Sequence, residues 1–99
     1  PLARHLETFA ESTVYPNEGL VVLNARGSSL AQMLYFIDQG IPVAAYTGEG
    51  QYLILCGFDQ YNVTVFDPQT GELYKAGLND STEFFRARGN DFICAVSLP

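Results

Sequence analysis

The chain has 99 residues, of which 47% are hydrophobic and 13% aromatic; this is enough for one packed domain, which we expect over residues 1–99, and too little for two. Its net charge of −6 disfavours nucleic acid and anionic lipid surfaces as partners. No stretch approaches the roughly 18 consecutive apolar residues of a membrane span, so we expect no direct membrane insertion.

The first part of the chain is predicted to form a short helix, a turn and a strand. Apolar residues recur at helical spacing over residues 2–10, which predicts an amphipathic helix there. Proline and glycine then predict a turn over residues 16–19, and an apolar run predicts a strand over residues 20–23. Because the chain begins at Pro1 rather than at methionine, we interpret it as a piece of a longer protein.

The clearest helix is predicted over residues 29–39. Ser29 and Gln32 have the spacing of a capping box, in which each side chain bonds a free amide at the start of the helix. Gly40 then suits the left-handed residue that ends a helix. A strand over residues 43–47 follows.

An antiparallel hairpin is predicted at the centre of the fold. Two runs rich in β-branched and aromatic residues, 52–58 and 63–66, flank the turn-forming cluster at residues 59–62. A further strand is predicted over residues 72–76, after a turn that contains Pro68.

The last part of the chain is predicted to form a second clear helix and a final strand of the same sheet. Asn79 or Asp80 is the expected N-cap, and Phe84 and Phe85 are expected to point inward. The strand over residues 92–97 alternates two sets of side chains. Together these elements predict an α+β fold with an antiparallel sheet packed against two to three helices.

The central hairpin resembles the C39-like family of cysteine peptidases. The family has Gly-His, then an apolar run ending in Gly-aromatic-Asp, then a strand ending in Asp-Pro. The corresponding residues are Gly50 and Gln51, the run that ends at Asp59, and Asp67 with Pro68. The resemblance covers about residues 28–97 and implies a papain-like half-fold.

The resemblance also shows which catalytic groups are missing. A cysteine peptidase needs a thiolate and a histidine base, but Gln51 stands at the histidine position and cannot accept a proton. The predicted helix at 29–39 contains no cysteine, and His5 is interpreted as a solvated surface residue. Cys56 and Cys94 fall in apolar strands, where we favour buried free thiols over a disulfide. We therefore assign no catalytic residue and expect no metal and no cofactor.

The remaining hypothesis is a peptide-binding groove on the former catalytic face. If Asp67 pairs near Leu53, then Gln51 and Asp67 lie at one end of the sheet, about two residues or ~7 Å apart along it. Tyr46 and Tyr52 are candidate lining residues, and an extended peptide can bind by strand addition. Equally, Gln51 can be a polar residue at a strand edge and Asp67 the cap of the following turn.

The sequence thus favours a non-catalytic C39-like domain that binds a peptide or protein partner. The resemblance places such a domain in a larger bacterial protein at the cell surface or outside the cell. One alternative is an enzyme fragment whose nucleophile and base lie outside this chain, with Asp67 orienting that base. Another is a structural or assembly domain, for which a self-complementary strand edge would be the sign.

Overall fold

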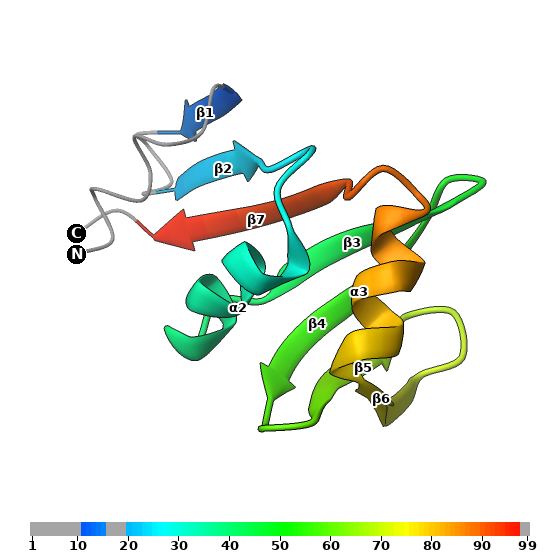
Figure 1. The fold of residues 1–99 in the computed structure, drawn as a ribbon. Helices are drawn as coiled ribbons and strands as arrows, with labels where there is room; N and C mark the ends of the chain where they lie inside the picture. The colour runs from blue at the N-terminus through cyan, green and yellow to red at the C-terminus, as the bar shows by residue number, and fades with distance from the viewer. Residues whose placement is uncertain (1–10, 16–19, 98–99) are drawn as a thin grey trace.

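The computed structural model describes residues 11–15 and 20–97. In this part of the chain, seven antiparallel strands form one sheet, and two helices pack on one of its faces (Figure 1). This arrangement confirms the predicted α+β class with an antiparallel sheet. The elements are β1 (Glu11–Tyr15), β2 (Leu20–Asn24), α2 (Leu30–Asp38), β3 (Val43–Gly48), β4 (Gln51–Phe58), β5 (Asn62–Asp67), β6 (Glu72–Gly77), α3 (Leu78–Arg86) and β7 (Phe92–Ser97).

The order of strands across the sheet is β1-β2-β7-β3-β4-β5-β6. Strands β3 to β6 form a meander of successive hairpins, which suits the short turns between them. The last strand, β7, lies between β2 and β3, so it joins the first two strands to the meander (Figure 1). The strands predicted from residue 20 onward are confirmed, with ends that differ by one residue in places.

The turn between β4 and β5 is fixed by one aspartate. Asp59 Oδ1 accepts hydrogen bonds from the backbone N–H groups of Tyr61 and Asn62, both at 2.9 Å. These bonds, together with Lys75 Nζ at 3.3 Å, hold the pKa of the Asp59 carboxyl below its ordinary value of 3.8 because they favour the ionised form. The predicted turn at residues 59–62 therefore forms through local side-chain bonding.

Helix α2 begins with the predicted capping box. Ser29 Oγ accepts from the N–H of Gln32 at 3.1 Å, and Ser29 N–H donates to Gln32 Oε1 at 2.7 Å. The helix ends before Gly40, whose φ of +80° is a backbone conformation that glycine adopts without steric cost. Between these ends, Met33 and Phe36 are among the side chains that α2 buries against the sheet.

Loss of this cap should measurably destabilise the fold. We expect Ser29→Ala to lower the free energy of unfolding by about 1 kcal/mol, because the N–H of Gln32 at the helix start loses its hydrogen bond to Ser29 Oγ. Urea unfolding followed by circular dichroism measures the change. Ser28→Ala is the matched control, since its backbone N–H bonds to Ala25 O and does not depend on its side chain. Equal effects of the two substitutions would contradict the capping role.

Helix α3 differs from its prediction at its start. It begins at Leu78, directly after β6, with Gly77 as an N-cap that offers no side-chain hydrogen bond. Asn79 and Asp80 lie inside the first turn, so the prediction that either one caps the helix is wrong. The strand runs into the helix without a loop, and this continuity sets the start of the helix.

The orientation of the two adjacent phenylalanines of α3 was only half predicted. Phe85 is buried at 3% exposure, whereas Phe84 keeps 38% of its surface exposed, so the prediction that Phe84 points inward is wrong. Neighbouring helix residues differ by about 100° in direction, so only one of them can face the core fully.

Strand β1 was not predicted. Glu11–Tyr15 pairs along its whole length with β2, although its first three residues are polar or charged. The predicted helix at 2–10 and the turn at 16–19 lie outside the described residues.

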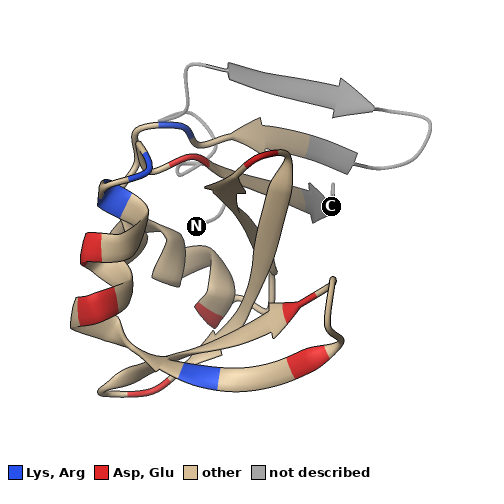
Figure 2. Cartoon of the chain, turned by 90° about the vertical axis from the view of Figure 1, so that its right-hand side faces the viewer, with Lys and Arg blue, Asp and Glu red and all other residues tan. Residues whose placement is uncertain are grey.

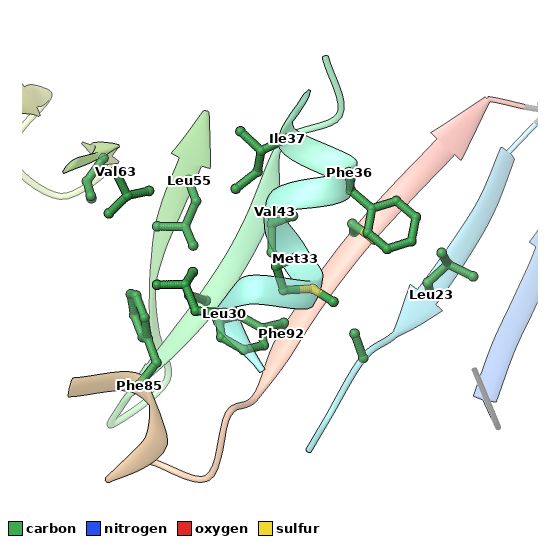
Figure 3. Close-up of a cluster of buried hydrophobic side chains, with 14 residues drawn as sticks. Leu23, Leu30, Met33, Phe36, Ile37, Val43, Leu55, Val63, Phe85 and Phe92 are labelled. Carbon is green, nitrogen blue, oxygen red and sulfur yellow. The ribbon is translucent and has the colours of Figure 1, made fainter. Parts of the chain in front are cut away.

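The core lies between the two helices and the strands beneath them (Figure 3). Side chains at alternate strand positions point to this face, as the buried pairs Val43 with Leu55 and Leu55 with Val65 show. The buried residues are Leu23, Ala25, Leu30, Met33, Phe36, Ile37, Val43, Ala45, Leu55, Val63, Val65, Phe85, Phe92 and Cys94. The helix-bearing face of the sheet is therefore the face on which a groove can form beside the core.

Candidate functional site

The two polar residues of the predicted groove lie on the helix-bearing face of the sheet. Gln51 opens β4 and is exposed, and Asp67 ends β5. Ile54 pairs with Phe66, so the register sets Asp67 beside Leu53 one position further on. Side-chain alternation then directs Gln51, Leu53 and Asp67 to the same face.

The two tyrosines of the predicted groove lie on the opposite face. Tyr46 and Tyr52 are direct partners across β3 and β4, and their rings meet edge to face with centroids 5.2 Å apart. The Tyr46 hydroxyl accepts a hydrogen bond from the N–H of Gly50 at 3.0 Å, which ties the ring to the β3–β4 turn. The structure therefore does not bring these tyrosines together with Gln51 and Asp67.

Asp67 also has a local structural role. Its Oδ1 accepts a hydrogen bond from the N–H of Gln69 at 2.9 Å, which closes the turn between β5 and β6. This is the turn-cap alternative recognised in the sequence. One carboxylate oxygen is engaged in this bond, and the carboxylate still contributes its charge to the surface.

The two cysteines are free thiols on opposite faces of the sheet. Cys94 is buried beside Val43 on the helix-bearing face, and burial raises the pKa of its thiol to about 11. Cys56 is exposed, with its Sγ 3.7 Å from Thr64 O, so the prediction that it is buried is wrong. The physical reason is that Cys56 follows the buried Leu55 on β4 and so points to the opposite face of the sheet, which neither α2 nor α3 covers.

A groove lies between α3 and the outer strands of the sheet, with a cavity volume of about 180 Å³. Its floor comes from β4, β5 and β6, and its wall comes from α3. A dry cavity of about 150 Å³ can hold a benzene ring, so this groove can take one aliphatic or aromatic side chain. The lining residues are Leu53, Val65, Tyr74, Ala76, Asp80, Ser81, Phe84 and Phe85.

The helical wall of this α3 groove is held firmly in place. The Arg88 guanidinium lies over the Phe84 ring, 3.6 Å from its centroid, and Arg88 Nη1 donates to Phe84 O at 2.9 Å. Phe84 also meets Phe85 edge to face at 5.3 Å, and Phe85 meets Phe92 in the core at 5.6 Å. Phe84 therefore links the open groove to a series of aromatic contacts that reaches Phe92 in the core.

Carboxylates stand at both ends of the α3 groove. Val65 pairs with Tyr74 in its floor, and two positions further along the same face Asp67 pairs with Glu72. Asp80 is itself a lining residue near the start of α3. Figure 2 shows this distribution, with Asp and Glu on α3 and at strand ends. The groove therefore combines an apolar floor with carboxylates at its two ends, while Arg88 lies over Phe84 on its helical wall. The carboxylates suit an apolar segment that carries cationic side chains at its ends.

Sequence reasoning missed the α3 groove because its residues come from four separate elements. The sequence signal for this groove was the presence of two aromatic residues at element positions open to solvent, Tyr74 on an edge strand and Phe84 on a helix. In the structure these residues keep 39% and 38% of their surface exposed. Exposed aromatics of this kind often mark binding sites. Their convergence depends on the packing of α3 over β5 and β6, which no local pattern specifies.

Other site classes find no support in the described part of the chain. Residues 11–15 and 20–97 hold no group of three or more His, Cys, Asp or Glu side chains placed to bind a metal ion. Among the helices of this same part, none has both the length and the apolar character needed to cross a membrane.

Comparison of the chain with protein-family models, with curated proteins and with solved structures found no match. The α3 groove and the adjoining edge of the sheet therefore carry the functional interpretation.

Proposed function

We propose that the domain is a non-catalytic binding module that holds an extended peptide segment of a partner protein. The peptide lies beside β6, and one of its apolar side chains enters the α3 groove. The observation that carries this proposal is the position of the groove, whose floor reaches Tyr74 and Ala76 on the outermost strand of the meander.

The free edge of β6 supplies the backbone contacts. In the described part of the chain β6 pairs only with β5, so alternate N–H and C=O groups on its other side are available to an added strand. Residues 72–75 of this strand are all exposed. Strand addition places every second side chain of the peptide on the helix-bearing face, next to the groove.

The charges around the α3 groove favour a particular peptide composition. Asp67 and Glu72 stand beyond one end of the floor and Asp80 stands at the other. A peptide with one aromatic or aliphatic anchor and flanking Lys or Arg residues places unlike charges at both ends. The acidic net charge of −6 further favours the approach of such a cationic segment.

The positions of the thiols support a binding role over thiol chemistry. Cys94 is buried with a raised pKa, and Cys56 lies on the face opposite Gln51 and Asp67. We retain the degenerate C39-like assignment, and a larger bacterial surface protein as the parent, as part of this proposal. Its support is the placement of Gln51 and Asp67 on one face of neighbouring strands, as the resemblance requires.

A defined peptide tests the α3 groove. The probe is a capped peptide in which Phe is flanked on each side by Val and then by Lys, so that Phe and both Lys side chains point to the helix-bearing face. It is titrated into isotopically labelled protein and followed by amide chemical shifts. We expect shifts in β6 and α3, and Phe84→Ala should weaken binding at least about 10-fold, because it removes the aromatic wall. Asp67→Asn should weaken binding several-fold, since the amide oxygen can still close the turn but the charge is lost.

Phe66→Ala is the matched control, because Phe66 is 36% exposed, close to the value for Phe84, but lies on the other face of the sheet. It should change the affinity by less than about twofold. The same peptide with Glu in place of Lys should bind at least about 10-fold more weakly. Equal binding of the Lys and Glu peptides, or shifts remote from β6 and α3, would refute the proposal.

A further inference from the structure

The sheet face opposite the two helices carries a continuous line of apolar side chains. Helices α2 and α3 lie on the other face and contact each other there, so no helix of the described residues covers this side (Figure 1). The line crosses five neighbouring strands, with one residue on each, and we call it the apolar row. Its members, in order across β7, β3, β4, β5 and β6, are Ile93, Ala44, Ile54, Phe66 and Leu73.

Strand pairing brings these residues into line. Each member of the row is the direct register partner of the next one along. Four strand spacings of about 4.8 Å make the row about 19 Å long. Its outer end is the most exposed, with Leu73 at 65% and Phe66 at 36%, and the tyrosine pair of β3 and β4 extends the apolar surface beside it. Such a surface is larger than scattered single apolar residues would give.

The face around the apolar row carries almost no charge. On the five strands that form it, the described residues pointing to this side include one charged side chain, Lys75, which is paired with Asp59 at 3.3 Å. No Asp or Glu side chain among the described residues of these five strands points to this side. A surface of this kind lets two copies of this acidic chain approach each other with little charge repulsion.

The sizes of the side chains make the apolar row complementary to itself. We propose that two copies of this chain dimerise face to face through the apolar row, about a two-fold axis that passes at Ile54. This axis sets the two rows antiparallel, so Phe66 of one copy covers Ala44 of the other, a large side chain over a small one. Leu73 likewise covers Ile93 at each end. Such an isologous contact closes on itself and forms a dimer.

The size of the face sets the expected affinity. Five strands by about six residues give roughly 20 × 20 Å, or about 400 Å² for each copy. The total of about 800 Å² lies below the roughly 1,200 Å² of stable interfaces, so we expect a weak, transient dimer with a dissociation constant of about 0.1 mM. The dimer leaves the edge of β6 and the α3 groove open, because both belong to the other face or to the rim.

Sedimentation velocity between about 10 µM and about 1 mM tests the dimer. We expect the average mass to rise from monomer towards dimer over this range. Leu73→Lys, at an exposed position on an edge strand, should weaken association at least about 10-fold without affecting folding. Tyr61→Lys is the matched control, because Tyr61 is 71% exposed in the β4–β5 turn and is not in the row, and it should associate like the original chain.

A pair of charge variants tests the two-fold arrangement itself. Phe66→Glu and Ala44→Lys should each be monomeric, while their mixture should form a heterodimer, because the new Glu of one copy faces the new Lys of the other. Circular dichroism confirms that each variant is folded.

The alkylation rate of Cys56, which is exposed beside the row on β4, should fall as the original chain dimerises. A chain that stays monomeric at about 1 mM overturns the proposal. If Cys56 of that monomer is alkylated slowly, residues of the same chain cover this face of the sheet. A mixture that does not associate also overturns the proposal.

Discussion

Replacement of Phe92 by alanine is expected to lower the free energy of unfolding by about 3–5 kcal/mol, the largest effect of any substitution considered. Phe92 is fully buried in β7, opposite Ala45, and its ring meets Phe85 of α3 edge to face with centroids 5.6 Å apart. Its removal leaves a cavity where the helical layer meets the middle of the sheet (Figure 3). Since domains of this size are stable by only about 5–15 kcal/mol, the variant should lose a large part of its stability.

Urea unfolding followed by circular dichroism provides the measurement for Phe92→Ala. Phe58→Ala is the matched control, because Phe58 is also a strand residue of the same sheet but is 39% exposed at the end of β4. We expect the control to cost less than about 1.5 kcal/mol. Similar losses at the two positions would mean that β7 does not anchor the core.

The alkylation rates of the two cysteines in the native protein should differ by a factor of at least about 100. Cys56 is accessible in the folded state, whereas Cys94 can react only when the structure opens. We expect Cys56 to react with iodoacetamide in the native protein and Cys94 to react only after unfolding. Mass spectrometry of peptides from native and denatured samples gives both rates. Comparable native rates would contradict the burial of β7.

The thiol of Cys94 should also give the fold a dependence on alkaline pH. Its pKa is about 11 in the folded chain, raised by burial from an ordinary value of 9.0. Below pH 9 both states hold the proton and stability is unaffected, whereas above pH 9 the unfolded chain loses it first. Stability should therefore fall as pH rises from 9 towards 11, and a Cys94→Ala variant should lose this component of the decline.

The sequence predicts those parts of the fold that depend on neighbours in the chain. The capping box at Ser29 and Gln32 and the turn at Asp59 satisfy backbone groups within three residues, so their patterns can be read directly. Two runs rich in β-branched and aromatic residues around a turn-forming cluster likewise identify the central hairpin. These signals were sufficient to predict an antiparallel sheet with helices against it.

The remainder depends on contacts between distant residues. Strand β1 has a polar start and is stabilised by its pairing with β2, which local propensity does not report. The start of α3 and the exposure of Phe84 depend on how the helix leaves β6. The place of β7 between β2 and β3 requires pairing across most of the chain and has no sequence signature.

The candidate site likewise has parts that depend on neighbours in the chain and parts that depend on distant contacts. The pairing of Asp67 near Leu53 was a condition of the predicted groove, and the β4–β5 turn alone does not provide it. The turn pairs Phe58 with Val63, and the bulge between Leu55 and Gly57 then shifts the register by one residue, which sets Asp67 beside Leu53. The separation of Tyr46 and Tyr52 from that face follows from simple alternation on β3 and β4. The α3 groove depends on helix packing, and its description had to come from the structure.

The central position of β7 also has a consequence for synthesis on the ribosome. Until residues 92–97 have emerged, β2 and β3 have no strand between them, and the chain can form only a β1–β2 hairpin and a separate β3–β6 meander. The edges that β7 will fill stay open during that time and are exposed to wrong partners. Folding of the sheet of described strands is therefore a late event, completed by the strand that comes last of the seven in chain order.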